Sequence, residues 1–454
     1  MEKTEEHLRT RPSADDQEPK LNYDILIHLL DFLDTSEMVP LMRTSKILFH
    51  EGTKRILSEG PALNSEKECR GFCRFVLADV PMRPQYLRVL YLIWEEKQLI
   101  TSSRTTTLLT DMLLQCHNLE KLVIQCQRIG GIEEDCFNRL AEHSFSKLKE
   151  LSILCSEDHD DDMSAKIVLL QACHSVLEEL TITDLSWLRH TGPIPELRKL
   201  KVTMTHQHEY FIAFLAIICP KLTHLDWMID AFQIEEYEPS EALRGMAIET
   251  QEQLANAGGR WHRLEHLGGD IDMLYESAIT CQVDVLKPDF VTLFDNTDIL
   301  YLRTVLNLTQ PRHVILPVQL SDLLEPPEYP AKKLISTHPG PMELTLNVDV
   351  DEWKPGALPA GLVFTSIVRL FKRLRIDTFN LSFGKFIPEE IPDKKVLDGR
   401  SSAVRVRKTY AEPYAEQLAE GIPSLQHITF KIPETPRFSW IVERSDAGEV
   451  LLRE

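Results

Sequence analysis

The sequence predicts an α/β chain in which a small N-terminal module of three helices precedes a long, irregular solenoid with a curved parallel sheet and outer helices. Three observations support this fold class. The segment after residue 20 carries only helical patterns of apolar residues. A short frame of spaced leucines then recurs along the chain, with a helical pattern between most copies. The 454 residues, 43% of them hydrophobic, are also too many for one conventional core.

The helical segment follows a polar stretch, residues 1–20, which we expect to be a disordered tail. Asn22 is placed to cap a first helix, and Asp34 followed by Glu37 is a capping signal for a second. A third helix is expected to carry Ile47, Leu48, Ile56 and Leu57. The apolar positions of the first two helices are Ile25, Leu26, Leu29, Leu30, Phe32, Leu33, Met38, Leu41 and Met42. Helices this short bury little surface by themselves, so they need a partner or a neighbouring domain.

The rest of the chain repeats the frame Leu-x-x-Leu-x-aliphatic. Copies begin at Leu87, Leu119, Leu148, Leu177, Leu197 and Leu222, between 20 and 32 residues apart, and degenerate copies begin at Leu264 and Leu425. The spacing fits a turn that enters a short strand whose alternate residues face a core. One strand and one returning helix in about 20–30 residues is the leucine-rich-repeat unit, which predicts an irregular solenoid.

We divide the chain from these patterns into a helical module at 21–58, a helical linker at 59–85, a repeat array at 86–432 and a capping hairpin at 433–454. The hairpin is expected to turn at Asp446-Ala447-Gly448 and to cover the last repeat. The repeat pattern weakens after about residue 230. Insertions are expected near 232–258, 325–341 and 384–410; the first is acidic and predicted to be partly helical, the second is proline-rich and the third has mixed charges.

Residues 20–58 resemble an F-box, whose pattern runs Leu-Pro-x-Glu-Ile-Leu, then Ile-Leu-x-x-Leu-Asp, then Val-Ser-Lys-x-Trp. The matching positions are Leu21, Asp24, Ile25, Leu26, Leu29, Leu30, Phe32, Leu33, Asp34, Met38, Leu41, Ser45 and Lys46. The segment departs from the pattern where Asn22 replaces the proline and Leu48 replaces the tryptophan. Pro40 must occupy the first turn of the second helix or kink it. With the repeats that follow, the chain resembles divergent fungal F-box proteins with leucine-rich repeats.

The resemblance implies the substrate-recognition subunit of an SCF-type ubiquitin ligase, which binds a Skp-family adaptor, joins a cullin scaffold and does no chemistry itself. The residues expected to contact the adaptor are Tyr23, Ile25, Leu26, Leu29, Leu30, Leu33, Met38, Leu41 and Met42; some of them must instead form the core of the module. A protein target would bind the outward strand positions Lys121, Val123, Gln125, Glu150, Ser152, Glu179, Thr181, Lys199, Lys201, His224 and Asp226. A leucine-rich scaffold that binds no adaptor remains the alternative.

Composition restricts the other classes of function. The formal net charge of −20 argues against a nucleic-acid partner, which needs clustered positive surface. No stretch is apolar enough for a secretory signal or a membrane span. The nine cysteines form no Cys-x-x-Cys pair, which predicts a reduced cytoplasmic or nuclear protein without disulfides.

One segment matches a catalytic pattern, since His262-Arg263-Leu264-Glu265-His266 spells an inverted zincin motif. Zinc binding requires both histidines on one face of a helix. The segment instead aligns with the repeat strands, where such histidines lie roughly 13 Å apart, so a zinc hydrolase is the remote alternative. The acidic loop 157–162 lacks the glycine and glutamate of a calcium loop, and His206 with His208 lacks a third ligand. We therefore expect no metal, no cofactor and no catalytic residue.

Overall fold

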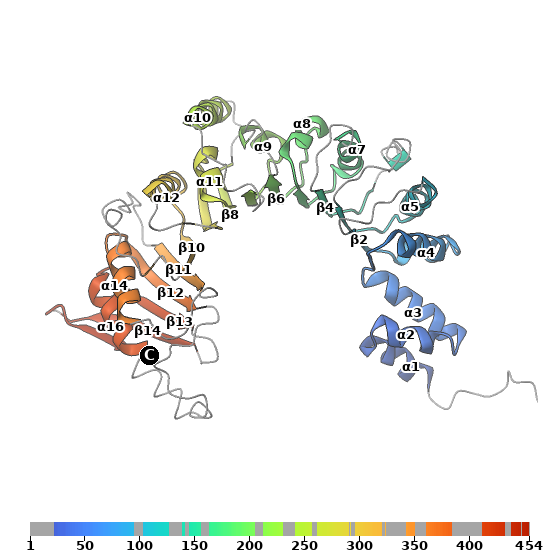
Figure 1. Cartoon of the computed structure of the whole chain (residues 1–454), viewed down its shortest axis with the longest axis horizontal. Coiled ribbons are helices and arrows are strands. Elements are labelled where there is room, and N and C mark those ends of the chain that lie inside the picture. Colours follow the sequence, from blue (N-terminus) through green and yellow to red (C-terminus); the bar gives the residue numbers. More distant parts are fainter. Residues whose placement is uncertain are drawn as a thin grey trace, which may run out of the picture.

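The computed structural model describes residues 22–94, 103–126, 139–140, 145–155, 163–204, 212–229, 241–256, 261–289, 291, 296–319, 323, 342–349, 360–383, 411–431, 437–445 and 447–453. The predicted tail at 1–20, the acidic loop at 157–162, the His206 and His208 pair, and the insertions at 325–341 and 384–410 lie outside these residues. The described part is an α/β arch with strands on its inner side and helices on its outer side (Figure 1).

One sheet runs through the arch, with its strands in the order of the sequence and parallel up to β13. The strands are β1 (Ala62–Leu63), β2 (Val89–Ile93), β3 (Lys121–Cys126), β4 (Glu150–Cys155), β5 (Glu179–Ile182), β6 (Lys199–Met204), β7 (His224–Ile229), β8 (Arg263–Gly269), β9 (Gln282–Pro288), β10 (His313–Gln319), β11 (Met342–Asp349), β12 (Ile376–Phe383), β13 (His427–Lys431), β14 (Phe438–Arg444) and β15 (Val450–Arg453). This long parallel sheet is compatible with the predicted solenoid.

Helices connect most neighbouring strands and cover the outer face of the sheet (Figure 1). The array helices are α4 (Glu66–Leu77), α5 (Ser103–Gln115), α7 (Met163–Cys173), α8 (Leu188–Thr191), α9 (Ile212–Ile218), α10 (Glu241–Asn256), α11 (Ile271–Ser277), α12 (Asn296–Thr309), α14 (Ala360–Phe371) and α16 (Glu412–Gly421), with 3-10 turns η2 (Pro84–Tyr86) and η4 (Leu185–Trp187). The N-terminal module contains α1 (Tyr23–Leu29), η1 (Leu30–Phe32), α2 (Thr35–Met42) and α3 (Lys46–Ser58).

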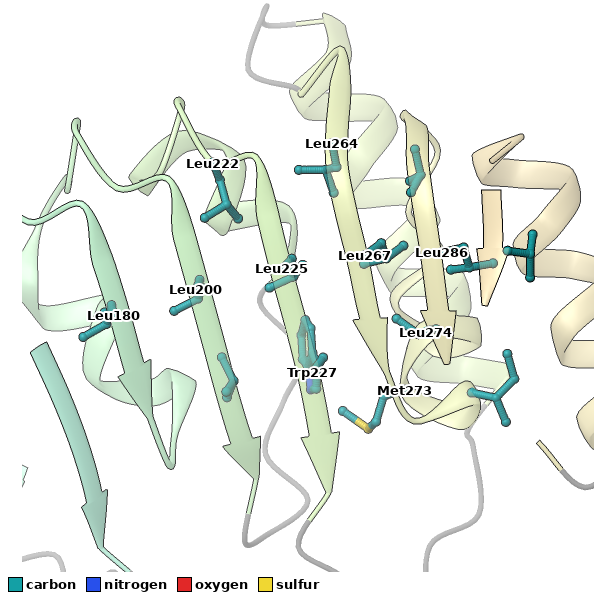
Figure 2. Packing of buried hydrophobic residues seen from close by; sticks show 14 of the residues in the cluster. Leu180, Leu200, Leu222, Leu225, Trp227, Leu264, Leu267, Met273, Leu274 and Leu286 are labelled. Carbon is teal, nitrogen blue, oxygen red and sulfur yellow. The ribbon is translucent and has the colours of Figure 1, made fainter. Parts of the chain in front are cut away.

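The recurring leucines build the core as one continuous row across the sheet. Strand register aligns Leu90, Leu122, Leu151, Leu180, Leu200, Leu225, Leu267, Leu286, Val314, Leu344, Phe379, Ile428 and Trp440. Each of these side chains is at most 2% exposed. Figure 2 shows the middle of this core, where Leu200, Leu225 and Trp227 lie on neighbouring strands on the helix side of the sheet. The leucine frame therefore predicted the side of each repeat strand that faces the core.

The structure adds three details to the sequence predictions. The segment 59–85, predicted as a helical linker, also contains β1, which pairs in parallel with β2, so the sheet begins before residue 86. Pro40 lies in the second turn of α2 rather than the first, and the helix ends two residues later at Met42. The insertion near 232–258, predicted to be partly helical, contributes the helix α10, which packs beside α9 and α11.

The end of the sheet reverses direction, as the predicted hairpin requires. β14 pairs antiparallel with β13 and with β15. Gly448 has a φ of +83° in the turn, a conformation that glycine adopts without strain. Arg444 donates hydrogen bonds of 2.7 Å and 3.1 Å to the carbonyl oxygens of Ala419 and Ile422, which fastens the hairpin to the end of α16.

Candidate functional site

The N-terminal module has a small core of its own, separate from the core of the array. Leu30, Met38, Met42 and Leu48 are buried together, and five further apolar side chains pack around them. Leu48, which stands where the F-box pattern has tryptophan, is one of the four buried residues. The module lies at one foot of the arch, beyond α4 (Figure 1). It is therefore a distinct packing unit at the end of the sheet.

Capping interactions determine where the short helices begin, as the sequence predicted. The Asn22 side chain accepts a 3.0 Å hydrogen bond from the Asp24 backbone N–H at the start of α1. Asp34 accepts from the Glu37 N–H at 3.0 Å, and the Glu37 carboxylate accepts in return from the Asp34 N–H at 3.4 Å. The hydrogen bond that Asp34 accepts from the Ser36 hydroxyl, followed by the backbone bond from Glu37, lowers the pKa of Asp34.

Close contacts fix the three helices against one another. Gly52 of α3 lies against Met42 of α2, and a Cβ at that glycine would meet the Met42 Cγ at 2.5 Å. Arg55 of α3 pairs with the carboxylate of Asp31, and its Nη2 donates to the Asp31 carbonyl at 2.9 Å. This contact ties η1 to α3.

The nine residues predicted to contact an adaptor occupy three different environments. Leu30, Met38 and Met42 are buried in the small core. Tyr23, Leu26, Leu33 and Leu41 are half-buried. Only Ile25 and Leu29 are open to solvent, at 52% and 41% exposure. The prediction that some of the nine form the core of the module is therefore confirmed, and only two of the nine are exposed.

The most exposed apolar side chain of the module was absent from that set. Phe32 is 78% exposed and follows Ile25 and Leu29 at the spacing i, i+4, i+7, so the three lie along one side of α1 and η1. We call these three residues the apolar stripe. The same helical spacing in the sequence could have identified Phe32 as its third member.

The helix α3 connects the module to the array without a flexible joint. Its Leu48 belongs to the small core, whereas Leu57, about two and a half turns later, belongs to the core of the array. Lys54 lies 5.6 Å from the ring centroid of Tyr86 in η2, and Arg83 lies 5.7 Å from that of Phe49. The stripe is therefore held in a defined position relative to the sheet.

The face of the sheet opposite the helices, here called the concave face, carries the polar positions that were predicted to point outward. Register aligns Lys121, Glu150, Glu179, Lys199 and His224 in one row. Lys121 pairs with Glu150 at 2.7 Å, and Lys199 pairs with Glu179 at 2.5 Å. These charges neutralise one another across neighbouring strands, so this part of the face has little free charge to attract a partner.

The centre of the concave face, on β7 and β8, holds a cluster of ionisable side chains. The rings of His224 and His266 stack with centroids 5.9 Å apart, and His266 Nε2 lies 2.9 Å from the Asp226 carboxylate. Burial raises the pKa of Asp226, but the hydrogen bond with His266 and the charges of Lys201 and Lys287 outweigh it, so the pKa lies below its ordinary value.

The inverted zincin segment forms a strand, which confirms the sequence interpretation. Arg263 to His266 lie in β8, and His262 precedes it, so the two histidines are not one helical turn apart. Gly269, with φ of +127°, lies against the Trp227 backbone, where a Cβ would approach the carbonyl oxygen to 1.7 Å. Within the described ranges, no group of three or more His, Cys, Asp or Glu side chains is placed to hold a metal ion.

The cysteines that precede the repeat strands are packing residues. Cys116, Cys173 and Cys219 are fully buried at helix ends, and burial raises the pKa of each thiol to about 12. The Sγ of Cys116 donates to the Met112 carbonyl at 3.1 Å. Such thiols are poor nucleophiles because almost none of them is ionised at neutral pH.

No family model matches the chain, and no match was found among the curated proteins. In the part of the chain that the structure describes, no helix is both long and apolar enough to cross a membrane.

Proposed function

We propose that the chain is the substrate-recognition subunit of an SCF-type ubiquitin ligase. Its N-terminal helices bind a Skp-family adaptor, and its array, a divergent leucine-rich-repeat solenoid, binds a protein target. The observation that carries this proposal is the apolar stripe Ile25, Leu29 and Phe32 on a module that has its own core and lies at the end of the arch. Because residues 20–58 resemble an F-box, the proposed partner of that surface is a Skp-family adaptor.

The stripe has the features of a helical docking surface. Apolar anchors at i, i+4 and i+7 are the usual contacts of a helix that packs into a partner's groove. Exposed side chains of this size cost free energy in water, and a partner that covers them gains about 25 cal/mol for each Å² of apolar area removed from water. The connection through α3 then fixes the position of a bound adaptor relative to the array.

In this proposal the chain does no chemistry itself. It joins a cullin scaffold through the adaptor and holds a target on the concave face, which raises the effective concentration of the target near a separate catalytic subunit. The described thiols of Cys69, Cys73, Cys116, Cys173, Cys219 and Cys281 are free, which agrees with a reducing compartment such as the cytoplasm or the nucleus.

The test is recovery of the purified chain on an immobilised Skp-family adaptor. The variant Leu29→Asp/Phe32→Asp changes two exposed side chains and leaves the small core intact. The control Ile217→Asp/Leu300→Asp introduces the same charges at two exposed apolar residues on α9 and α12.

We expect the wild type and the control to be recovered and the stripe variant to be lost, with all three chains folded by circular dichroism. No recovery of the wild type, or equal recovery of the stripe variant, would reject the adaptor role. The chain would then fit the alternative, a leucine-rich scaffold whose N-terminal helices only cap the array.

A further inference from the structure

Within the described residues, the last strand of the sheet has one edge that pairs with no other strand. Among the described strands, β15 has β14 as its one neighbour. Ser445 N–H donates to the Glu449 carbonyl at 3.0 Å just before the strand begins, which identifies these two residues as a hydrogen-bonded pair. Antiparallel register alternates, so Leu451 also bonds toward β14, whereas Val450 and Leu452 direct their N–H and C=O groups outward.

The side chains near this edge are divided between the two faces of the sheet. Val450 and Leu452 pack against the core of the array. Leu451 points to the concave face and is 52% exposed, and Ile441 of β14 shares that face at 45% exposure. The edge thus combines free backbone groups with an exposed apolar patch, a combination that natural sheets normally avoid.

The outward groups of β15 are arranged symmetrically about Leu451. If the β15 edges of two copies pair antiparallel about a two-fold axis through Leu451, Val450 of each copy lies opposite Leu452 of the other copy. All four outward groups of each strand then find partners, and the two Leu451 side chains meet on the axis. An isologous contact of this kind closes after two copies.

The charges at the ends of β15 agree with the same register. The two-fold axis places Glu449 of each copy opposite Arg453 of the other copy, which makes two such pairs. Charged residues at a sheet edge usually discourage pairing, but here symmetric pairing brings opposite signs together. Arg453 already lies 2.9 Å from Glu443 within its own chain, so each arginine would lie between two carboxylates.

From this geometry we propose that the chain forms a homodimer in which the β15 edges of two copies pair antiparallel about Leu451 and make one continuous sheet. The N-terminal modules stay free, because they lie at the opposite foot of each arch (Figure 1). The proposal does not depend on the adaptor role.

Sedimentation equilibrium of the full chain over a concentration series tests the proposal. We expect a species of twice the 52.2 kDa chain mass. Glu449→Arg places an arginine opposite Arg453 in both pairs, so like charges repel and association should weaken roughly tenfold. Glu443→Arg/Glu449→Arg/Arg453→Glu inverts all three charges, so opposite signs face each other across the axis and within each chain, and it should restore association. Glu252→Arg, an equal charge change at an exposed position of α10, should have no effect.

Disulfide capture supplies a second measurement that does not depend on charge. Leu451→Cys places two thiols on the axis in a non-hydrogen-bonded pair, where Cα atoms lie about 4.5 Å apart and a disulfide fits. We expect it to form a covalent dimer under mild oxidation, whereas the similarly exposed Ile441→Cys does not. A wild type that stays monomeric, charge variants that behave alike, or equal crosslinking of both cysteine variants would overturn the proposal.

Discussion

Met38→Ala should unfold the front of the N-terminal module and leave the array intact. Met38 is fully buried, in a core of only four side chains. Burying four such side chains contributes roughly 6–12 kcal/mol before the entropy of ordering the helices is subtracted. Truncating a buried methionine to alanine costs about 2–5 kcal/mol. The change therefore removes a large fraction of the stability of the module.

The expected result is local, because the two cores are separate. Amide hydrogen exchange should accelerate roughly 30-fold or more in α1, η1 and α2. The C-terminal half of α3 should stay protected, since Leu57 lies in the core of the array. Leu225→Ala, which truncates a buried side chain of β7, is the matched control and should accelerate exchange in the array strands only.

Two results would refute this reasoning. Faster exchange throughout the sheet in Met38→Ala would mean that the module and the array unfold as one unit. Unchanged exchange in α1 and α2 would mean that the small core does not stabilise the module.

Three further predictions concern the array. Gly269→Ala should lower the free energy of unfolding by about 3 kcal/mol in urea titrations, because its Cβ would collide with the Trp227 carbonyl at a positive φ; a change below about 0.5 kcal/mol would contradict the fit. The pKa of Asp226 is lower in the folded state than its ordinary 3.8, so its contribution to stability is present above that pH and is lost as the pH falls through the folded pKa. Asp226→Asn should therefore lower the urea midpoint of unfolding at pH 7 but not at a pH below the pKa of Asp226 in the folded state. An equal loss at both pH values would mean that Asp226 stabilises the fold by packing and not by its charge. Cys281 is half-buried, whereas Cys69, Cys73, Cys116, Cys173 and Cys219 are buried. Of these six, Cys281 should therefore react first with a thiol reagent in the native protein; peptide mapping that finds Cys173 labelled before Cys281 would refute the burial pattern.

The repeat pattern made the first part of the sheet predictable. Leu122, Leu151 and Leu180 recur in the same frame, and each lies in the buried row where the frame placed it. The strand interpretation of His262–His266 followed from the same alignment. A frame of leucines carries this information because alternate residues of a strand face opposite sides.

The later strands were harder to predict because their inward residues vary. β11 and β12 place Leu344 and Phe379 in the buried row without the leucine frame that marks earlier copies. β1 has two residues, too few for any alternation. Propensity and spacing cannot identify such strands, since their pairing with neighbours determines them.

The candidate site was predictable as a segment but not residue by residue. Helical spacing identified a wide apolar face, yet such a face includes both the side chains that form a core and those that stay outside. Met38 and Leu29 have similar patterns in the sequence, and only packing against α3 separates the buried residue from the exposed one. Phe32 was omitted although its spacing from Leu29 placed it on the exposed side.

Hydrogen exchange of the wild-type chain with and without a Skp-family adaptor tests the central claim most directly. The account predicts added protection in Tyr23–Met42, where the apolar stripe lies, and unchanged exchange in β2 to β8. Protection confined to the array strands, or none at saturating adaptor, would contradict it.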